Sequence, residues 1–240
     1  EIYCYKILSI DPNHVESISL LGTISAIHKN FLKAKELMLK ALEIQPKNKS
    51  YLNNLGTSYK ELGNLKEAEN IYKKILEIDP KHTNANYNLG LIFYQLGELK
   101  ASKSYLQKTV SIQKNYAIAF FSLANVHVDL KELKEAVSCY HKAIEINPSI
   151  VSAHNNLGLL YRELNDFQNA KRCYEKAISI KFDHASSHHN LALAHKELGE
   201  FEKSIKSHQQ AIIHEPDNLM HYHFLSEVKK DILDNNLRKK

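Results

Sequence analysis

The sequence contains one phrase twice. Residues 52–63 read LNNLGTSYKELG, residues 154–165 read HNNLGLLYRELN, and seven of the twelve positions are identical. The two stretches start 102 residues apart, which is three times 34. This spacing indicates an internal repeat of 34 residues, and a repeat of that length decides the fold class.

The residues that constrain the backbone most follow the same period. All five prolines share one position of the repeat, and all seven glycines fall in two positions. The residue before the first glycine position is leucine in seven successive copies, from Leu21 to Leu225. The sequence therefore predicts a tandem array with six whole units, which are residues 15–48, 49–82, 83–116, 117–150, 151–184 and 185–218.

One unit, residues 49–82, has the pattern of two helices. Leu52, Leu55 and Tyr59 recur at three- and four-residue steps, as on one face of an α-helix. Gly63 then interrupts the pattern, because glycine accepts the positive φ that ends a helix. A second apolar stripe ends before Pro80, whose ring cannot continue a helix. Each unit is thus predicted to be an antiparallel helix pair, and stacked pairs bury a continuous core in an all-α solenoid.

These residues resemble a known family. A 34-residue helix–turn–helix with Leu-Gly, an aromatic residue three positions later, a mid-helix alanine such as Ala68 and a closing proline is similar to the tetratricopeptide repeat (TPR). The resemblance covers nearly the whole chain and implies a right-handed superhelical solenoid whose first helices line a concave groove. One departure is the absence of tryptophan. The position where the family usually has it holds Ile18, Leu52, Asn86, Phe120, His154 and His188.

The two ends differ from the whole units. Residues 1–14 have the pattern of a second helix, so we expect a truncated upstream repeat and a longer parent protein. Residues 219–240 start as a seventh unit and then leave the pattern, as a partial repeat or capping helix does. The alternative is a junction, since this segment resembles the stretch that joins TPR arrays to sulfotransferase-like domains in some bacterial proteins.

Composition excludes several classes. No stretch approaches the roughly 20 apolar residues of a membrane span. The net charge of +5 comes from lysines interleaved with glutamates, whereas nucleic-acid binding needs a clustered basic stripe. Cys139 and Cys173 lie 34 residues apart in adjacent units, and packed helices are about 8–10 Å apart, too far for a disulfide. We therefore expect free thiols, a reducing cytoplasmic setting, and neither membrane nor nucleic acid as partner; a structural disulfide is the less favoured alternative.

The sequence shows no catalytic constellation. It has no phosphate-binding glycine loop, no Gly-x-Ser-x-Gly and no His-Glu-x-x-His, so we expect this segment to be no enzyme and to need no cofactor. His184 and His188 have the i,i+4 spacing of metal ligands but fall in different elements. His127 and His195 occupy a position that is aromatic in other units. Structural histidines are therefore favoured over a metal site.

One position of the first helices forms a ladder of small polar residues: Asn54, Asn88, Ser122, Asn156 and Asn190. An asparagine amide carries both donors and an acceptor, so an exposed ladder could hold an extended peptide backbone without reading its side chains. The units resemble those of the nucleocytoplasmic N-acetylglucosamine transferase, which implies such a use. The alternative is that asparagine is simply common at this place in the family.

Other groove positions change character along the chain. The third and fourth units present Tyr87, Leu91, Tyr94, Ile118, Phe121 and Val128. The flanking units present Asn53, Thr57, Lys60, Asn155, Arg162 and Lys196, and Asn125 completes the candidate peptide-binding residues. An apolar centre with a polar rim is typical of a partner-binding surface; the alternative is shielding by neighbouring helices. Capture of a C-terminal carboxylate, another use of the family, is disfavoured because the required Lys and Arg positions hold Asn, Tyr and Phe.

The sequence thus predicts a non-enzymatic scaffold that binds an extended peptide or a neighbouring domain in its concave groove. A different class of function is the substrate-presenting arm of a transferase, sulfotransferase-like or glycosyltransferase-like, whose catalytic domain lies outside this segment. A third possibility is weak self-association through the groove or the ends of the stack.

Overall fold

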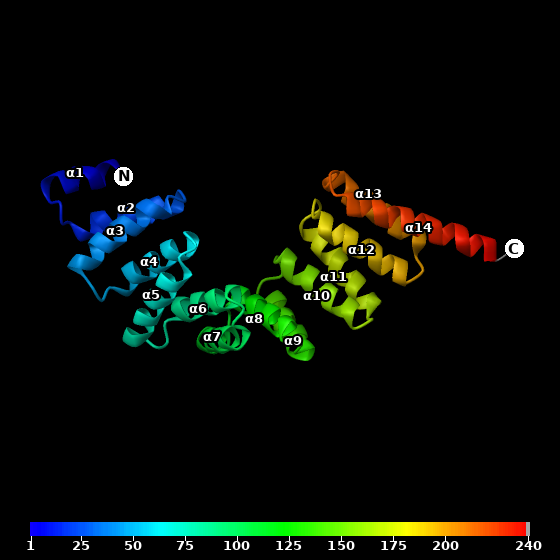
Figure 1. The fold of residues 1–240 in the computed structure, drawn as a ribbon, viewed down its shortest axis with the longest axis horizontal. Coiled ribbons are helices and arrows are strands. Elements are labelled where there is room, and N and C mark those ends of the chain that lie inside the picture. Colours follow the sequence, from blue (N-terminus) through cyan, green and yellow to red (C-terminus); the bar gives the residue numbers. More distant parts are fainter. Residues whose placement is uncertain (239–240) are drawn as a thin grey trace. The chain divides into compact units, whose positions relative to one another are not determined.

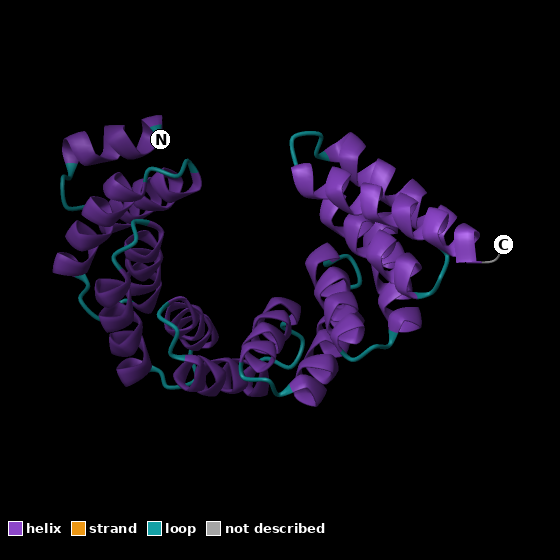
Figure 2. Cartoon of the chain, turned by 45° about the vertical axis from the view of Figure 1, so that its right-hand side comes forward, coloured by secondary structure: helices purple, strands orange, loops and turns teal. Residues whose placement is uncertain are grey.

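The computed structural model describes residues 1–238. Within these residues the regular secondary structure is α-helix, with no β-strand (Figure 2). The chain divides into two compact units, Glu1–Asn115 and Tyr116–Lys240, and each is described by itself. Of the described helices, none combines the length and the apolar character that a membrane span requires.

The first unit holds seven helices (Figure 1). They are α1 (Ile2–Ile10), α2 (Val15–Ile27), α3 (Phe31–Ile44), α4 (Lys49–Glu61), α5 (Leu65–Ile78), α6 (Thr83–Gln95) and α7 (Leu99–Ile112). From α2 onward they pack as pairs, α2 on α3, α4 on α5 and α6 on α7, and α3 also packs on α4 and α5 on α6. The expected stack of helix pairs is therefore present in this unit.

The second unit repeats the arrangement. Its helices are α8 (Ala117–Asp129), α9 (Leu133–Ile146), α10 (Val151–Glu163), α11 (Phe167–Ile180), α12 (Ala185–Glu197), α13 (Phe201–His214) and α14 (Leu219–Arg238). The last helix packs on α13 and is longer than the other first helices. The all-α prediction is confirmed.

The turn inside each pair follows from one backbone position. Gly63, Gly97 and Gly199 have positive φ there, between 72° and 78°. After Gly63 the chain donates from the Asn64 N–H to the Tyr59 carbonyl, 2.9 Å away, which satisfies a carbonyl at the end of α4. Lys29, Lys131 and Asn165 adopt the same conformation near φ 60° in the other pairs.

Small residues let the two helices of a pair approach closely. A Cβ atom added to Gly56 would lie 2.8 Å from Cζ of Tyr72, and one added to Gly158 would lie 2.5 Å from Cε1 of Tyr174. Both tyrosines are fully buried. The second helix contributes its own small residue to each crossing, such as the fully buried Ala68.

Two serines replace alanine at that second-helix position. Ser102 Oγ donates to the Gly90 carbonyl and Ser204 Oγ donates to the Ala192 carbonyl, each at 2.7 Å. Both serines are fully buried. The replacement is tolerated because each hydroxyl binds the backbone of the facing helix, so no buried polar group is left unpaired.

Candidate functional site

The asparagine ladder of the first unit is hydrogen-bonded inside the fold. Asn54 Nδ2 donates to Thr23 Oγ1 at 3.2 Å, which joins α4 to α2. Asn88 Oδ1 accepts from Lys60 Nζ at 3.0 Å, and its Nδ2 donates to the Asn84 carbonyl. Both asparagines are half-buried. Both amides therefore link successive first helices through hydrogen bonds within the protein.

The second unit uses the same link. Asn156 Nδ2 donates to Asn125 Oδ1 at 3.2 Å, joining α10 to α8. Asn190 Nδ2 donates to Asn155 Oδ1 at 3.1 Å, joining α12 to α10. Ser187 Oγ donates to the same Asn155 oxygen. Each bond spans 31 to 35 residues, which is close to one repeat. The ladder residues therefore join the first helices of neighbouring repeats.

The exposure expected at two ladder positions and one flanking groove position is wrong. Ser122, Asn155 and Asn190 are buried, with only 8–9% of their surface exposed. The physical reason for Asn155 and Asn190 is that each first helix is covered by its neighbours in the stack, and these two amides satisfy one another at the contact. The sequence carried a signal for the ties, because Thr23 and Asn125 share the position that accepts the bond.

Asn125 is the junction of the second unit's network. Its Oδ1 accepts from the Tyr140 hydroxyl at 2.6 Å and from Asn156 Nδ2. Two donors on one carbonyl oxygen occupy both of its lone pairs and fix which way the amide points. The Asn125 Nδ2 group then lies on the opposite side of the amide with two N–H donors, on a side chain that is half-buried.

The apolar candidates lie on two helices, one in each unit. Tyr87, Leu91 and Tyr94 are half-buried on α6. On α8, the Phe121 ring packs on Tyr140 with 6.1 Å between ring centroids, and it contacts the buried core of the second unit. Partial shielding by neighbouring helices therefore applies to Phe121, whereas Ile118 on the same helix is exposed.

The three cationic candidates differ in whether they form hydrogen bonds or ion pairs. Lys60 binds Asn88 and lies 3.6 Å from a Glu61 oxygen. Lys196 pairs with Asp231 on α14 at 3.0 Å. Arg162 is half-buried on α10 and makes no hydrogen bond or ion pair with the residues that the structure describes. Its guanidinium is the uncommitted charge among these three.

Polar residues at the usual tryptophan position hold the turn between units. His154 Nε2 binds the Pro148 carbonyl at 2.9 Å, and His188 Nε2 binds the Phe182 carbonyl at 2.7 Å. Asn86 Nδ2 makes the corresponding bond to Pro80. Each reaches back six residues, and all three side chains are buried. Packing at this position is therefore complete without an indole ring.

His127 and His195 are buried, as expected for residues in an aromatic position. Sequence reasoning missed their partners, since Nδ1 of each histidine binds a glutamate five residues later, Glu132 and Glu200. Lys171 and then His195 lower the pKa of the Glu200 carboxyl to about 2. The described residues contain no group of three or more histidine, cysteine or acidic side chains arranged to hold a metal ion.

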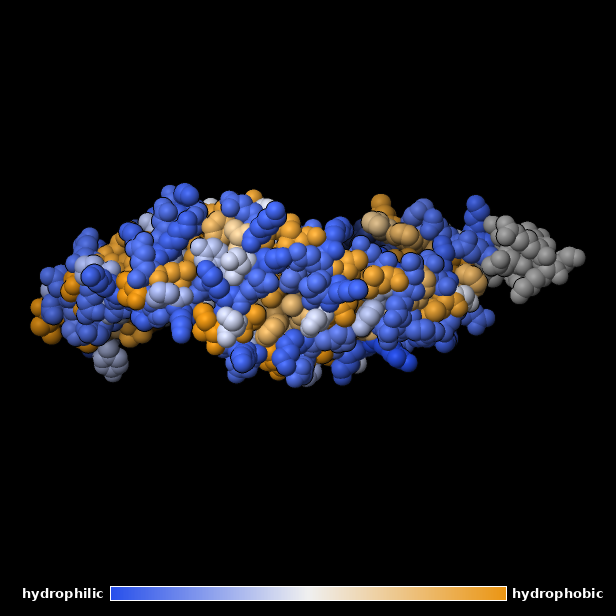
Figure 3. All heavy atoms as spheres, turned by 90° about the horizontal axis from the view of Figure 1, so that it is seen from below, coloured by the Kyte–Doolittle hydropathy of each residue, from blue (hydrophilic) through white to orange (hydrophobic). Residues whose placement is uncertain are grey.

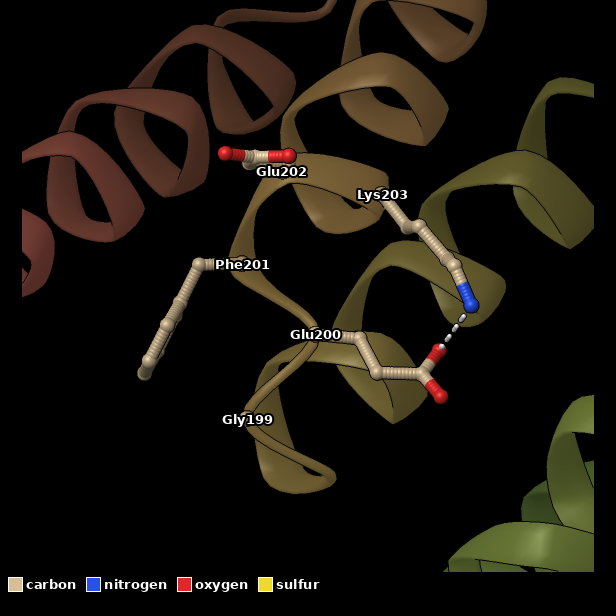
Figure 4. Close-up of a pocket in the computed structure, with 5 residues that line it drawn as sticks. All are labelled: Gly199, Glu200, Phe201, Glu202 and Lys203. Atoms are coloured by element: carbon tan, nitrogen blue, oxygen red, sulfur yellow. Dashed lines mark hydrogen bonds and ion pairs between the residues drawn. The ribbon is translucent and has the colours of Figure 1, made fainter.

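A surface hollow of about 370 Å³ lies at the turn between α12 and α13 (Figure 4). Its lining residues are Gly199, Glu200, Phe201, Glu202 and Lys203. The Phe201 ring points away from Glu200 and Lys203, which form an ion pair at 3.3 Å. Since one continuous stretch provides the whole lining, this hollow brings no separate elements together. The face in Figure 3 is mostly hydrophilic with scattered apolar atoms.

Cys139 and Cys173 are free, half-buried thiols. Burial, together with nearby acidic residues, raises the pKa of each to about 11. We expect both to react with iodoacetamide at pH 8 at least about 100-fold more slowly than an unperturbed thiol, because the thiolate is the reactive form. Mass spectrometry of timed samples measures the rates. The same chain in urea is the control, and equal rates in native and unfolded protein would contradict the prediction.

Comparison with protein families settles the family. Models described as TPR repeat or tetratricopeptide repeat match residues 49–115, 124–163, 151–184 and 187–219. The chain is a tetratricopeptide repeat protein. A search of curated proteins gave no match to this TPR sequence.

Solved structures with the same fold include three informative ones. PilF of Pseudomonas aeruginosa matches with a TM-score of 0.78 at 19% identity, over 89% of this chain and 97% of its own. YrrB, described as a TPR protein with an unusual peptide-binding site, matches at 0.68 and 22% identity, over 79% and 98%. MamA matches at 0.65 and 24% identity, over 72% and 94%. The fold of this TPR protein is that of a protein-interaction scaffold.

Proposed function

We propose that this TPR protein binds an extended peptide, or an extended segment of a neighbouring domain, along the faces of its first helices. The observation that carries the proposal concerns two N–H donor groups on successive first helices of the second unit. Neither group donates a hydrogen bond to the residues that the structure describes. The Asn125 amide nitrogen is oriented by two bonds to its oxygen, and the Arg162 guanidinium has no partner among the described residues. N–H donors held in advance suit the carbonyl and carboxylate oxygens of a peptide.

The other candidates have supporting parts in this proposal. Tyr87, Leu91, Tyr94 and Phe121 anchor apolar side chains of the ligand, because aromatic residues dominate binding energy at protein interfaces. Asn54, Asn88, Asn156 and Asn190 hold neighbouring first helices at a fixed spacing. The half-buried Asn54, Asn88 and Asn156 offer their remaining carbonyl lone pairs to the ligand backbone. The description of YrrB as a peptide-binding TPR protein supports a peptide as the class of ligand.

The test is selection of peptides from a displayed library on the whole chain, followed by affinity measurement with variants. We expect Arg162→Ala to weaken the selected peptides at least about tenfold, which is about 1.4 kcal/mol. Asn125→Ala should weaken them as well. The matched control is Arg172→Ala, which removes the same charge from an exposed site on the second helix α11.

The comparison between the two arginine variants decides the result. Equal loss of affinity in both would indicate attraction by net charge only. Unchanged affinity in the Arg162 variant would place the binding site elsewhere on the molecule. Circular dichroism on each variant checks that the helices remain intact.

A further inference from the structure

Histidine is concentrated at one end of the second unit. Eight of the fourteen histidines lie between residues 184 and 223. Three of them, His189 on α12, His208 on α13 and His221 on α14, meet where the last helix packs on the preceding pair. The ring centroid of His189 lies 5.3 Å from that of His208 and 5.1 Å from that of His221. We call these three residues the histidine cluster.

The histidine cluster is buried and poorly supplied with partners. His208 is fully buried, and neither of its ring nitrogens has a hydrogen-bond partner among the described residues. His221 is 3% exposed, and its Nδ1 lies 3.4 Å from His189 Nδ1. Phe224 of α14 packs on both His189 and His208, with centroids at 5.0 and 6.1 Å. The rings of His189 and His208 are therefore packed mainly against other aromatic rings.

Charged groups of both signs lie around the histidine cluster. Those that act on its rings are Arg162 of α10, Lys196 of α12 and Glu215 of the turn before α14. Glu227 and Asp231 both lie on Lys196, at 3.9 and 3.0 Å. Among the side chains that the structure describes, that leaves Glu215, which is half-exposed and lies 3.3 Å from His221 Nε2, as the acid in direct contact with the cluster.

Burial is the main reason that the pKa values of His189 and His208 fall to about 4. Positive charge adds to the effect, from His221 and Arg162 at His189, and from the other histidines and Lys196 at His208. A solvent-exposed histidine titrates near 6.5. A state in which α14 leaves α12 and α13 would expose the faces of His189 and His208 that His221 and Phe224 cover, and would move both pKa values toward that ordinary value.

We propose that the histidine cluster is a pH-sensitive switch that releases α14 from α12 and α13 in weakly acidic solution while the helix pairs before it stay folded. Release is local because α14 is the last helix in a stack where each element contacts its neighbours, so one interface is lost. The released state binds more protons than the docked state. Docking is therefore fully stable above pH 6.5 and weakens as the pH falls toward 4.

The expected size of the effect follows from these pKa values. For one histidine whose pKa is about 4 when docked and 6.5 when released, lowering the pH from 7.5 to 5 shifts the equilibrium by about 30-fold toward release. Two such histidines give a larger shift. The test pH of 5 lies above the ordinary carboxyl pKa values of about 4, so most carboxylates of the stack are still charged there.

The test is amide hydrogen exchange of the whole chain at pH 7.5 and pH 5, corrected for the intrinsic exchange rate at each pH. We expect peptides from residues 219–231 to lose at least about 30-fold protection at pH 5, while peptides from α10 and α11 keep theirs. Unchanged protection of residues 219–231 would overturn the proposal. Equal loss in α10 and α11 would also overturn it, because the unit would then be unfolding as a whole.

Two variants assign the effect to the cluster. His208→Leu introduces the residue that occupies the same position in α7, Leu106, and should reduce the loss of α14 protection at pH 5 to the part that His189 contributes. His223→Asn is the matched control, since His223 lies on α14 with a side chain that is 68% exposed, and it should behave as the wild type. Release at pH 5 that persists unchanged in His208→Leu would overturn the assignment.

A second measurement uses the wild-type chain, so it does not depend on whether a variant folds. Titration of the histidine ring protons by NMR on the wild-type chain should give apparent pKa values below 5 for His189 and His208, or a release transition at that pH. Ordinary values near 6.5 with α14 still docked would overturn the proposal.

Discussion

Gly158→Leu is expected to lower the free energy of unfolding by at least about 3 kcal/mol. The added Cβ alone would lie 2.5 Å from Cε1 of Tyr174, and leucine adds three further carbon atoms to the same space. Tyr174 is fully buried, so its ring has no room to turn away. Urea denaturation of the whole chain, followed by circular dichroism, measures the loss.

The chain provides its own control for this substitution. Alanine already occupies the same position in α8 and α12, as Ala124 and Ala192. In α8 that alanine faces a buried tyrosine, Tyr140, which shows that the pair of helices can open enough for one methyl group. Gly158→Ala should therefore cost less than about 1 kcal/mol, because higher helix propensity offsets the closer contact. A similar loss for Ala and Leu would mean that the close approach at Gly158 is not the cause.

Removing one hydroxyl should have opposite effects in two adjacent pairs. The Tyr140 hydroxyl donates to Asn125 Oδ1 at 2.6 Å. The Tyr174 hydroxyl is buried and has no partner among the described residues. Tyr140→Phe is thus expected to lower the free energy of unfolding by about 1–2 kcal/mol, whereas Tyr174→Phe should leave it unchanged or raise it by about 1 kcal/mol.

The difference between the two variants comes from the residue that faces each hydroxyl. Asn125 supplies an acceptor to Tyr140, and the matching position in the next unit is Leu159, which cannot. Denaturation curves of both phenylalanine variants, measured together with the wild type, give the comparison. If both variants lost stability equally, the Tyr174 hydroxyl would have to be satisfied in the native protein, for example by water.

The architecture was predictable because its signals lie in the backbone-constraining residues. The Leu-Gly positions marked the first helix of each pair, and the prolines marked the ends of second helices. In residues 49–82 the predicted interruption at Gly63 and the stop before Pro80 agree with helices at 49–61 and 65–78. The turn glycines were also correct, although Lys29, Lys131 and Asn165 take the same left-handed conformation without glycine's freedom.

The candidate site was less predictable, for a physical reason. A repeat position shows which face of a helix a residue is on, but the degree of burial depends on what the neighbouring helix presents there. Asn54 and Asn190 share one position, yet the first is half-buried on Thr23 and the second is buried against Asn155. The partners of His127 and His195 were also missed. The aromatic residues at this position in other repeats explain why a buried ring is accepted there, but they do not predict the partner of its Nδ1 atom.

The ties between first helices have a kinetic consequence. Among the side-chain bonds that the structure describes, the longest separations are about one repeat, as in Asn190 to Asn155 at 35 residues and Asn54 to Thr23 at 31. A chain whose contacts are this local has a low contact order, and the loop closed by each bond is short. Ordering can therefore begin at any helix pair and spread to its neighbours in both directions, without waiting for distant ends of the polypeptide to meet.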